Sequence, residues 1–97
     1  MRKVYTTAAA ELSYYKTLDY LQVNWSNTEH QNFEEQVQRI LTTIVNHPFA
    51  YPATESNKVI RKAVILNVIS MYYRVYDDSI EVLLFWDNRR NPEALSL

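Results

Sequence analysis

The stretch from Val59 to Leu95 constrains the fold of this 97-residue chain more than any other part of the sequence. It contains three runs that are rich in β-branched and aromatic residues, at 59–65, at 68–76 and from Ile80 onward, with short breaks between them. Such residues favour strands, and short breaks favour antiparallel pairing of successive strands. The stretch therefore predicts a three-stranded antiparallel meander that ends in a basic, turn-forming tail.

The first half of the chain predicts one strand, over Lys3–Thr6, and two helices. The helices are expected at about 8–25 and 28–46, because each segment carries an apolar stripe with helical spacing. The stripes are Tyr14, Leu18, Leu21 and Trp25 in the first helix and Phe33, Val37, Ile40, Leu41 and Ile44 in the second. A short link predicts that the helices pack antiparallel. The chain is thus expected to be a single α+β domain over residues 1–97, with the order β-α-α-β-β-β.

Two local signals refine this prediction. Thr7 is expected to cap the first helix, and Ser26 with Glu29 has the spacing of a capping box for the second. The prolines that bound the 48–52 loop fix extended backbone, and we expect its aromatic residues, Phe49 and Tyr51, to pin the loop to the core.

A two-residue turn at Asp77 and Asp78 defines a register for the last two strands. On one face it pairs Val75 with Ile80, Tyr73 with Val82, Met71 with Leu84 and Ile69 with Trp86, and on the other it pairs Arg74 with Glu81, Tyr72 with Leu83 and Ser70 with Phe85. In this register one face is wholly apolar or aromatic and is expected to pack on the helices; it carries Ile69, Met71, Tyr73, Val75, Ile80, Val82, Leu84 and Trp86. The opposite face is predicted to bind a partner, since an uncovered patch with apolar residues often marks such a site. Its residues are Tyr72, Arg74, Leu83, Phe85 and Asp87. The alternatives are that the C-terminal tail covers this face, or that its residues merely support the loop.

Composition excludes several classes of protein. The chain has no glycine and no cysteine, which excludes Gly-rich phosphate loops, disulfides and thiolate metal sites. A formal net charge of −1 argues against binding nucleic acid by bulk charge, although a local basic patch is compatible with it. His30 and His47 lack neighbours that would make a triad or a metal site. With no signal peptide or membrane span in the sequence, we expect a cytoplasmic protein without membrane contact, metal or cofactor.

Three segments resemble the RelE/ParE family of bacterial toxins, which includes the plasmid stabilisation proteins. They are Ile60-Arg61-Lys62, Tyr72-Tyr73-Arg74-Val75, and the ending Phe85-Trp86-Asp87-Asn88-Arg89-Arg90-Asn91-Pro92 with Leu95. The resemblance covers almost the whole chain. It implies the toxin of a type II toxin–antitoxin pair, which inhibits growth through ribosome-dependent mRNA cleavage or through DNA gyrase. It also implies a groove for a cognate antitoxin. The alternative is a non-toxic, degenerate toxin fold that only pairs with a small partner protein.

The resemblance implies four basic candidates for a ribonuclease site: Arg61 and Lys62 in the second strand, and Arg89 and Arg90 after the last. RelE-like members need such a cluster because cleavage requires activation of the 2′-OH and stabilisation of phosphorane charge. Alternation sends Arg61 and Lys62 to opposite faces. Ser70 stands where RelE-like members place an arginine, and no tyrosine follows Arg90. The catalytic set is therefore incomplete, and a RelE-like enzyme and a ParE-like gyrase inhibitor both stay open.

Overall fold

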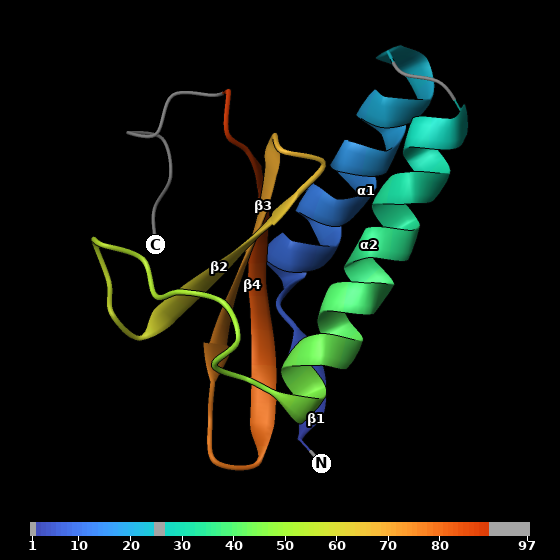
Figure 1. The fold of residues 1–97 in the computed structure, drawn as a ribbon. Coiled ribbons are helices and arrows are strands. Elements are labelled where there is room, and N and C mark those ends of the chain that lie inside the picture. Colours follow the sequence, from blue (N-terminus) through green and yellow to red (C-terminus); the bar gives the residue numbers. More distant parts are fainter. Residues whose placement is uncertain (1, 25–26, 90–97) are drawn as a thin grey trace.

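The computed structural model describes residues 2–24 and 27–89, and over these ranges it contains the predicted elements in the predicted order (Figure 1). These are β1 (Lys3–Thr6), α1 (Ala8–Asn24), α2 (Asn27–Asn46), β2 (Ile60–Ile65), β3 (Ile69–Val75) and β4 (Ser79–Asp87). The two helices lie antiparallel and cover one face of a four-stranded sheet with the order β1-β4-β3-β2. The predicted α+β fold is confirmed.

The helices form where the sequence supplies caps and apolar stripes. The Ala10 amide donates to Thr7 Oγ1 at 2.9 Å, which is the predicted cap of α1. In α2 the stripe is buried, with Leu41 half-buried; in α1 Leu21 is buried and Tyr14 and Leu18 are half-buried against the same core. Trp25 and Ser26, and with Ser26 the predicted capping box, lie outside the described residues.

Strand β4 lies between β1 and β3 in the sheet and is also bonded to Thr7 and to Ser13 of α1. β1 runs parallel to β4, and the Lys3 amide donates to the Asp78 carbonyl at 3.2 Å. After β1, Thr7 Oγ1 donates to the Leu83 carbonyl at 2.8 Å, and Ser13 Oγ accepts from the Phe85 amide at 3.0 Å. These bonds fix α1 against β4, so residues 3–13 and 78–85 form one unit despite their separation in sequence.

A β-bulge in β4 shifts the predicted register by one residue. The turn at Asp77 and Asp78 is confirmed, since the Tyr76 amide donates to the Ser79 carbonyl at 2.8 Å. The first pairs are as predicted, Val75 with Ile80, Arg74 with Glu81 and Tyr73 with Val82. Leu83 is then an extra residue, so the following pairs are Tyr72 with Leu84, Met71 with Phe85, Ser70 with Trp86 and Ile69 with Asp87. The predicted pairs Met71–Leu84, Ile69–Trp86, Tyr72–Leu83 and Ser70–Phe85 are wrong.

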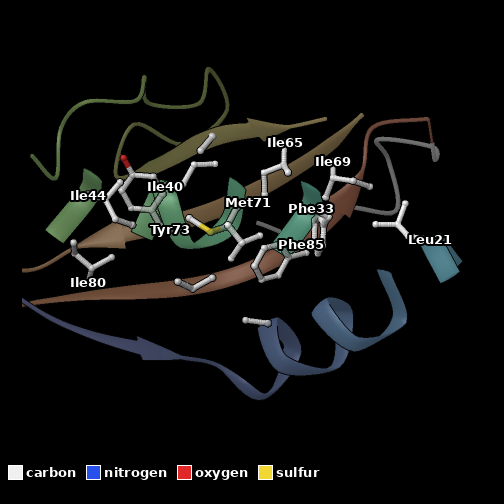
Figure 2. Close-up of a cluster of buried hydrophobic side chains, with 14 residues drawn as sticks. Leu21, Phe33, Ile40, Ile44, Ile65, Ile69, Met71, Tyr73, Ile80 and Phe85 are labelled. Carbon is white, nitrogen blue, oxygen red and sulfur yellow. The ribbon is translucent and has the colours of Figure 1, made fainter. Parts of the chain in front are cut away.

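The bulge exchanges the faces of the last residues of β4. Phe85 is only 7% exposed and lies in the core beneath the helices, where its ring centroid is 5.3 Å from that of Tyr14. Figure 2 shows it in the same cluster as Phe33 and Met71. Leu84 and Trp86, predicted in that core, instead pack with Tyr72 on the other side of the sheet. The assignments of Phe85, Leu84 and Trp86 from strict alternation were therefore wrong.

The turn between β2 and β3 places two non-glycine residues in the left-handed region. Leu66 has φ 53° and Asn67 has φ 65°, and the Val68 amide donates to the Ile65 carbonyl at 3.3 Å. Two positive φ angles in succession define a type I′ turn, for which Asn is favoured and Leu is not. The Gln36 side chain of α2 accepts from the Leu66 amide at 3.2 Å and helps to hold this conformation.

Candidate functional site

We call the sheet face opposite the helices the open face. A small cluster of Ile60, Tyr72 and Trp86 lies on it, with the half-buried Leu83 and Leu84 packed around them. Of the predicted partner residues, Tyr72, Leu83 and, by alternation along β3, Arg74 are on this face. Tyr72 is only 6% exposed. It therefore packs beneath the surface of this face and offers little contact area to a partner. Phe85 and Asp87 are on the helix side, because the bulge moves them there, and their placement on this face was wrong.

Arg74 is the exposed cation of the open face. Its guanidinium carbon lies 4.9 Å from the ring centroid of Tyr76, which is itself 40% exposed. Its cross-strand neighbour is Glu81, but among the described residues the two side chains form no ion pair within 4.0 Å. The pair of Arg74 and Tyr76 therefore offers a cation stacked on an aromatic ring, an arrangement that contributes on the order of 0.5–1 kcal/mol at an exposed site.

Arg61 holds a loop. Its Nη1 donates to the Tyr51 carbonyl at 2.6 Å, and its guanidinium lies 4.8 Å from the ring centroid of Phe49. The buried Tyr73 hydroxyl donates to the Pro48 carbonyl at 3.0 Å. Burial raises the pKa of Tyr73 above 10, and the nearby Arg61 charge opposes this. Tyr51 packs on the core as expected, but Phe49 is 62% exposed, so the expectation that it pins the loop to the core was wrong.

Lys62 points away from Arg61, as predicted. Ala63, two residues beyond Arg61, is in the core beneath the helices, whereas Ile60, two residues before Lys62, is in the open-face cluster. Lys62 is half-buried and pairs across the strands with Tyr72. Only one of the two cations can therefore contact a substrate on either face.

Arg89 lies at the end of β4 beside α1. Its Nη2 is 2.7 Å from Asp87 Oδ2 and its Nε donates to Asp87 Oδ1 at 2.9 Å, a two-point contact. The same guanidinium lies 5.5 Å from the ring centroid of Tyr20. The Asp87 carboxylate raises the pKa of Arg89 above its ordinary value. The fourth candidate, Arg90, lies outside the described residues.

A hollow of about 180 Å³ adjoins this contact, between α1 and the end of β4. Its lining combines one lysine, one carboxylate and hydroxyl groups from α1: Ser13, Lys16, Thr17, Tyr20, Phe85 and Asp87. Sequence reasoning missed the role of Tyr20 because 69 residues separate it from Arg89. No spacing rule connects two positions so far apart, and only the pairing of α1 with β4 brings them together.

Ser70 is fully buried, and its Oγ donates to Asn88 Oδ1 at 2.7 Å. Because this hydroxyl is neutral, Ser70 supplies no positive charge that could stabilise a phosphate.

The histidines and acidic residues form no metal site in the described part of the chain. His30 Nδ1 lies 3.3 Å from Glu34 Oε1 on the surface of α2. Within residues 2–24 and 27–89, no three His, Cys, Asp or Glu side chains are placed to hold a metal ion. Over the same ranges, neither helix is long and apolar enough to cross a lipid bilayer.

The described basic candidates do not form one cluster. Arg61 is on the helix side of β2, Lys62 is on the open face, and Arg89 is beside α1. Two of the three are engaged with groups of the chain itself, Arg61 with a backbone carbonyl and Arg89 with a carboxylate. Stabilising the charge of one phosphorane requires several donors that converge on one point, and these side chains point in different directions.

The fold is that of toxins from bacterial toxin–antitoxin systems. The chain is similar to a chain of the chromosomal ParDE TA system from P. aeruginosa, with a TM-score of 0.67 and 18% identity over 90% of this chain and 96% of that one. It is similar to a chain of the E. coli DinJ-YafQ toxin-antitoxin complex, with a TM-score of 0.61 and 10% identity over 91% and 93%. It is also similar to a copper-bound mutant toxin from Helicobacter pylori, with a TM-score of 0.65 and 15% identity over 92% and 97%.

These similarities show a RelE/ParE-like fold over nearly the full chain, as the sequence predicted. No protein-family model matches the sequence, and no curated protein matches it. At 10 to 18% identity the likeness is one of fold, and the roles of individual side chains rest on the geometry described above.

Proposed function

We propose that this chain is the toxin of a type II toxin–antitoxin pair, that a cognate antitoxin neutralises it, and that it acts in the bacterial cytoplasm. The observation that carries the proposal is the fold, which matches toxin chains over about nine-tenths of this chain. Two of the similar structures come from toxin–antitoxin systems. The exposed Tyr76 and Arg74 on the open face supply the kind of surface on which a protein partner binds.

We further propose that the toxin acts by binding its target, with DNA gyrase as the expected one, and not by cutting mRNA. The dispersed positions of Arg61, Lys62 and Arg89 favour this choice. The neutral, buried Ser70 favours it as well. A ribonuclease would need these groups to converge on a scissile phosphate, whereas an inhibitor that binds a protein has no such requirement.

The experiment is induction of the chain in a bacterial host, with measurement of growth, of mRNA integrity on translating ribosomes, and of the supercoiling of a reporter plasmid. The proposal expects growth arrest, intact mRNA and loss of negative supercoiling. Codon-linked mRNA cleavage that disappears in Lys62→Ala and Arg89→Ala would replace the binding mechanism with the RelE-like one. Undisturbed growth with folded protein at high level would support the degenerate binding module instead.

A further inference from the structure

Helix α1 has apolar side chains on both of its sides. Its inner side packs on the core through Ala10 and Leu21, whereas Leu12 and Val23 are 58% and 83% exposed on its outer side. Among the described residues, four of the exposed large apolar or aromatic side chains belong to α1 and none belongs to α2. A surface helix ordinarily has a polar outer side, and a helix that is apolar all round is covered all round. The outer side of α1 therefore has the character of a contact surface.

The outer side of α1 has the spacing of a seam between two packed helices. We call this line of exposed side chains the α1 seam; it consists of Leu12, Lys16, Asp19 and Val23. Successive members are four, three and four residues apart, which places them in one line along the helix. The exposed Tyr15 and Tyr20 lie on its two flanks. Apolar residues thus stand at the ends of the seam and opposite charges at its middle.

The α1 seam is complementary to itself when a second copy is reversed. In an antiparallel pair with a two-fold axis at the middle of the seam, Leu12 lies opposite Val23 of the second copy, and Lys16 lies opposite Asp19 of the second copy. A parallel pair would instead place like charges together. Within the described part of the chain neither Lys16 nor Asp19 forms an ion pair within 4.0 Å, so both charges can be used between copies.

We infer that α1 packs antiparallel on α1 of a second copy of this chain, and that the chain is a weak, reversible homodimer. This inference does not rest on the proposed function. An antiparallel partner must present an acid opposite Lys16 and a base opposite Asp19, and a second copy of the chain presents both. α1 has 17 residues, which makes it about 25 Å long. Two helices of this length bury an area at the low end of protein interfaces, so we expect a dissociation constant between about 1 μM and about 1 mM.

The first experiment is sedimentation equilibrium of the full chain, at loading concentrations from about 1 μM to about 1 mM, the expected range of the dissociation constant. We expect the mean molecular mass to rise from that of the monomer toward twice that value, and to fall again on dilution. A mass that stays monomeric over the whole range would overturn the inference, and a different protein would then be the candidate for this side of α1.

Charge reversal distinguishes the α1 seam from any other self-contact. In Lys16→Glu the new carboxylate faces Asp19 of the second copy, and the two-fold axis repeats this repulsion, so the dissociation constant should rise about tenfold or more. Lys58→Glu makes the same change of net charge at an exposed position outside α1 and should change the dissociation constant by less than about threefold. Lys16 is exposed as well, and far-UV circular dichroism checks that both variants fold. Equal dissociation constants for the two variants would overturn the inference.

The double exchange tests which charges face each other. Combining Lys16→Glu with Asp19→Lys in one chain restores opposite charges across an antiparallel pair, so its dissociation constant should return to within about threefold of the wild-type value. A double variant that associates as weakly as Lys16→Glu would overturn the contact between Lys16 and Asp19 of the second copy.

Engineered thiols report the direction of packing, because the chain has no cysteine of its own. Under mild oxidation a mixture of Leu12→Cys and Val23→Cys should form disulfide-linked dimers, since these positions face each other. Val23→Cys alone should not, because the two copies of that position lie about 16 Å apart along an antiparallel pair and a disulfide requires Cα atoms within about 7 Å. Cross-linking of Val23→Cys with itself and not with Leu12→Cys would overturn the antiparallel arrangement.

Discussion

Replacing Phe85 with alanine tests the register of β4, on which the assignment of both sheet faces depends. Phe85 is 7% exposed, and its ring packs 5.3 Å from that of Tyr14 and 6.2 Å from that of Phe33. Removing a buried phenylalanine lowers the free energy of unfolding by about 3–5 kcal/mol. Since a domain of this size is stable by roughly 5–15 kcal/mol, the variant should lose a large share of its stability.

Leu84→Ala is the matched control, because the two positions exchange roles between the registers. With the bulge, Leu84 is half-buried on the open face, and its truncation should lower the free energy of unfolding by about 1 kcal/mol. Without the bulge, Leu84 would be the core residue and Phe85 the exposed one, so the order of the two effects would be reversed.

The assay is urea denaturation followed by far-UV circular dichroism, with the midpoint and slope fitted for each variant. Phe85→Leu should be included, because it retains most of the buried volume. It keeps the comparison with Leu84→Ala usable if Phe85→Ala does not fold. A larger loss of stability for Leu84→Ala than for Phe85→Ala would refute the bulged register and return Phe85 to the open face.

Three further predictions follow from single contacts. Arg61→Ala should lower the free energy of unfolding by about 1–3 kcal/mol in urea titrations, because the charged hydrogen bond to the Tyr51 carbonyl is lost. Lys62→Ala should change this free energy little. Equal effects of the two substitutions would contradict a role of Arg61 in holding the loop. Burial raises the pKa of Tyr73 and Tyr14 above 10, so stability should be intact below pH 10 and fall as pH rises above it, since the unfolded chain loses these protons first. Tyr73→Phe should reduce this loss of stability above pH 10. An unchanged dependence of stability on pH in the variant would contradict the contribution of Tyr73. Asn67→Val should destabilise the folded chain by about 1–2 kcal/mol in thermal melts, because a β-branched residue is disfavoured at positive φ. Asn67→Gly should not destabilise it. Equal melting temperatures of the two variants would contradict the left-handed conformation of Asn67 in the turn between β2 and β3.

The sequence predicted the elements and their order because its local signals agree with one another. The apolar stripe of α2, Thr7 before α1 and the turn at Asp77 each favour one local structure. The predicted register also held from that turn as far as Tyr73. It failed at Leu83 because Leu83 and Leu84 are both apolar, so the pattern is compatible with either residue facing the core. No glycine marks the bulge, and it is the bonding of α1 to the Leu83 and Phe85 backbone that holds it.

The candidate site was predictable only in part. Alternation correctly separated Arg61 from Lys62, since they are adjacent in one strand. It gave no information on their partners, because the contacts of Arg61 with Tyr51 and of Arg89 with Tyr20 span a loop and most of the chain. Both arginines were candidates for target contact, and both are held by groups of the chain itself. Whether Arg61 and Arg89 contact the target stays a prediction.

The proposed toxin function is tested most directly by counting colony-forming cells after induced expression of the chain, alone and together with the product of the adjacent reading frame. We predict a loss of viable counts by orders of magnitude when the chain is expressed alone, and recovery when its partner is present. Unchanged counts in cells that contain folded chain at high level would contradict the toxin function.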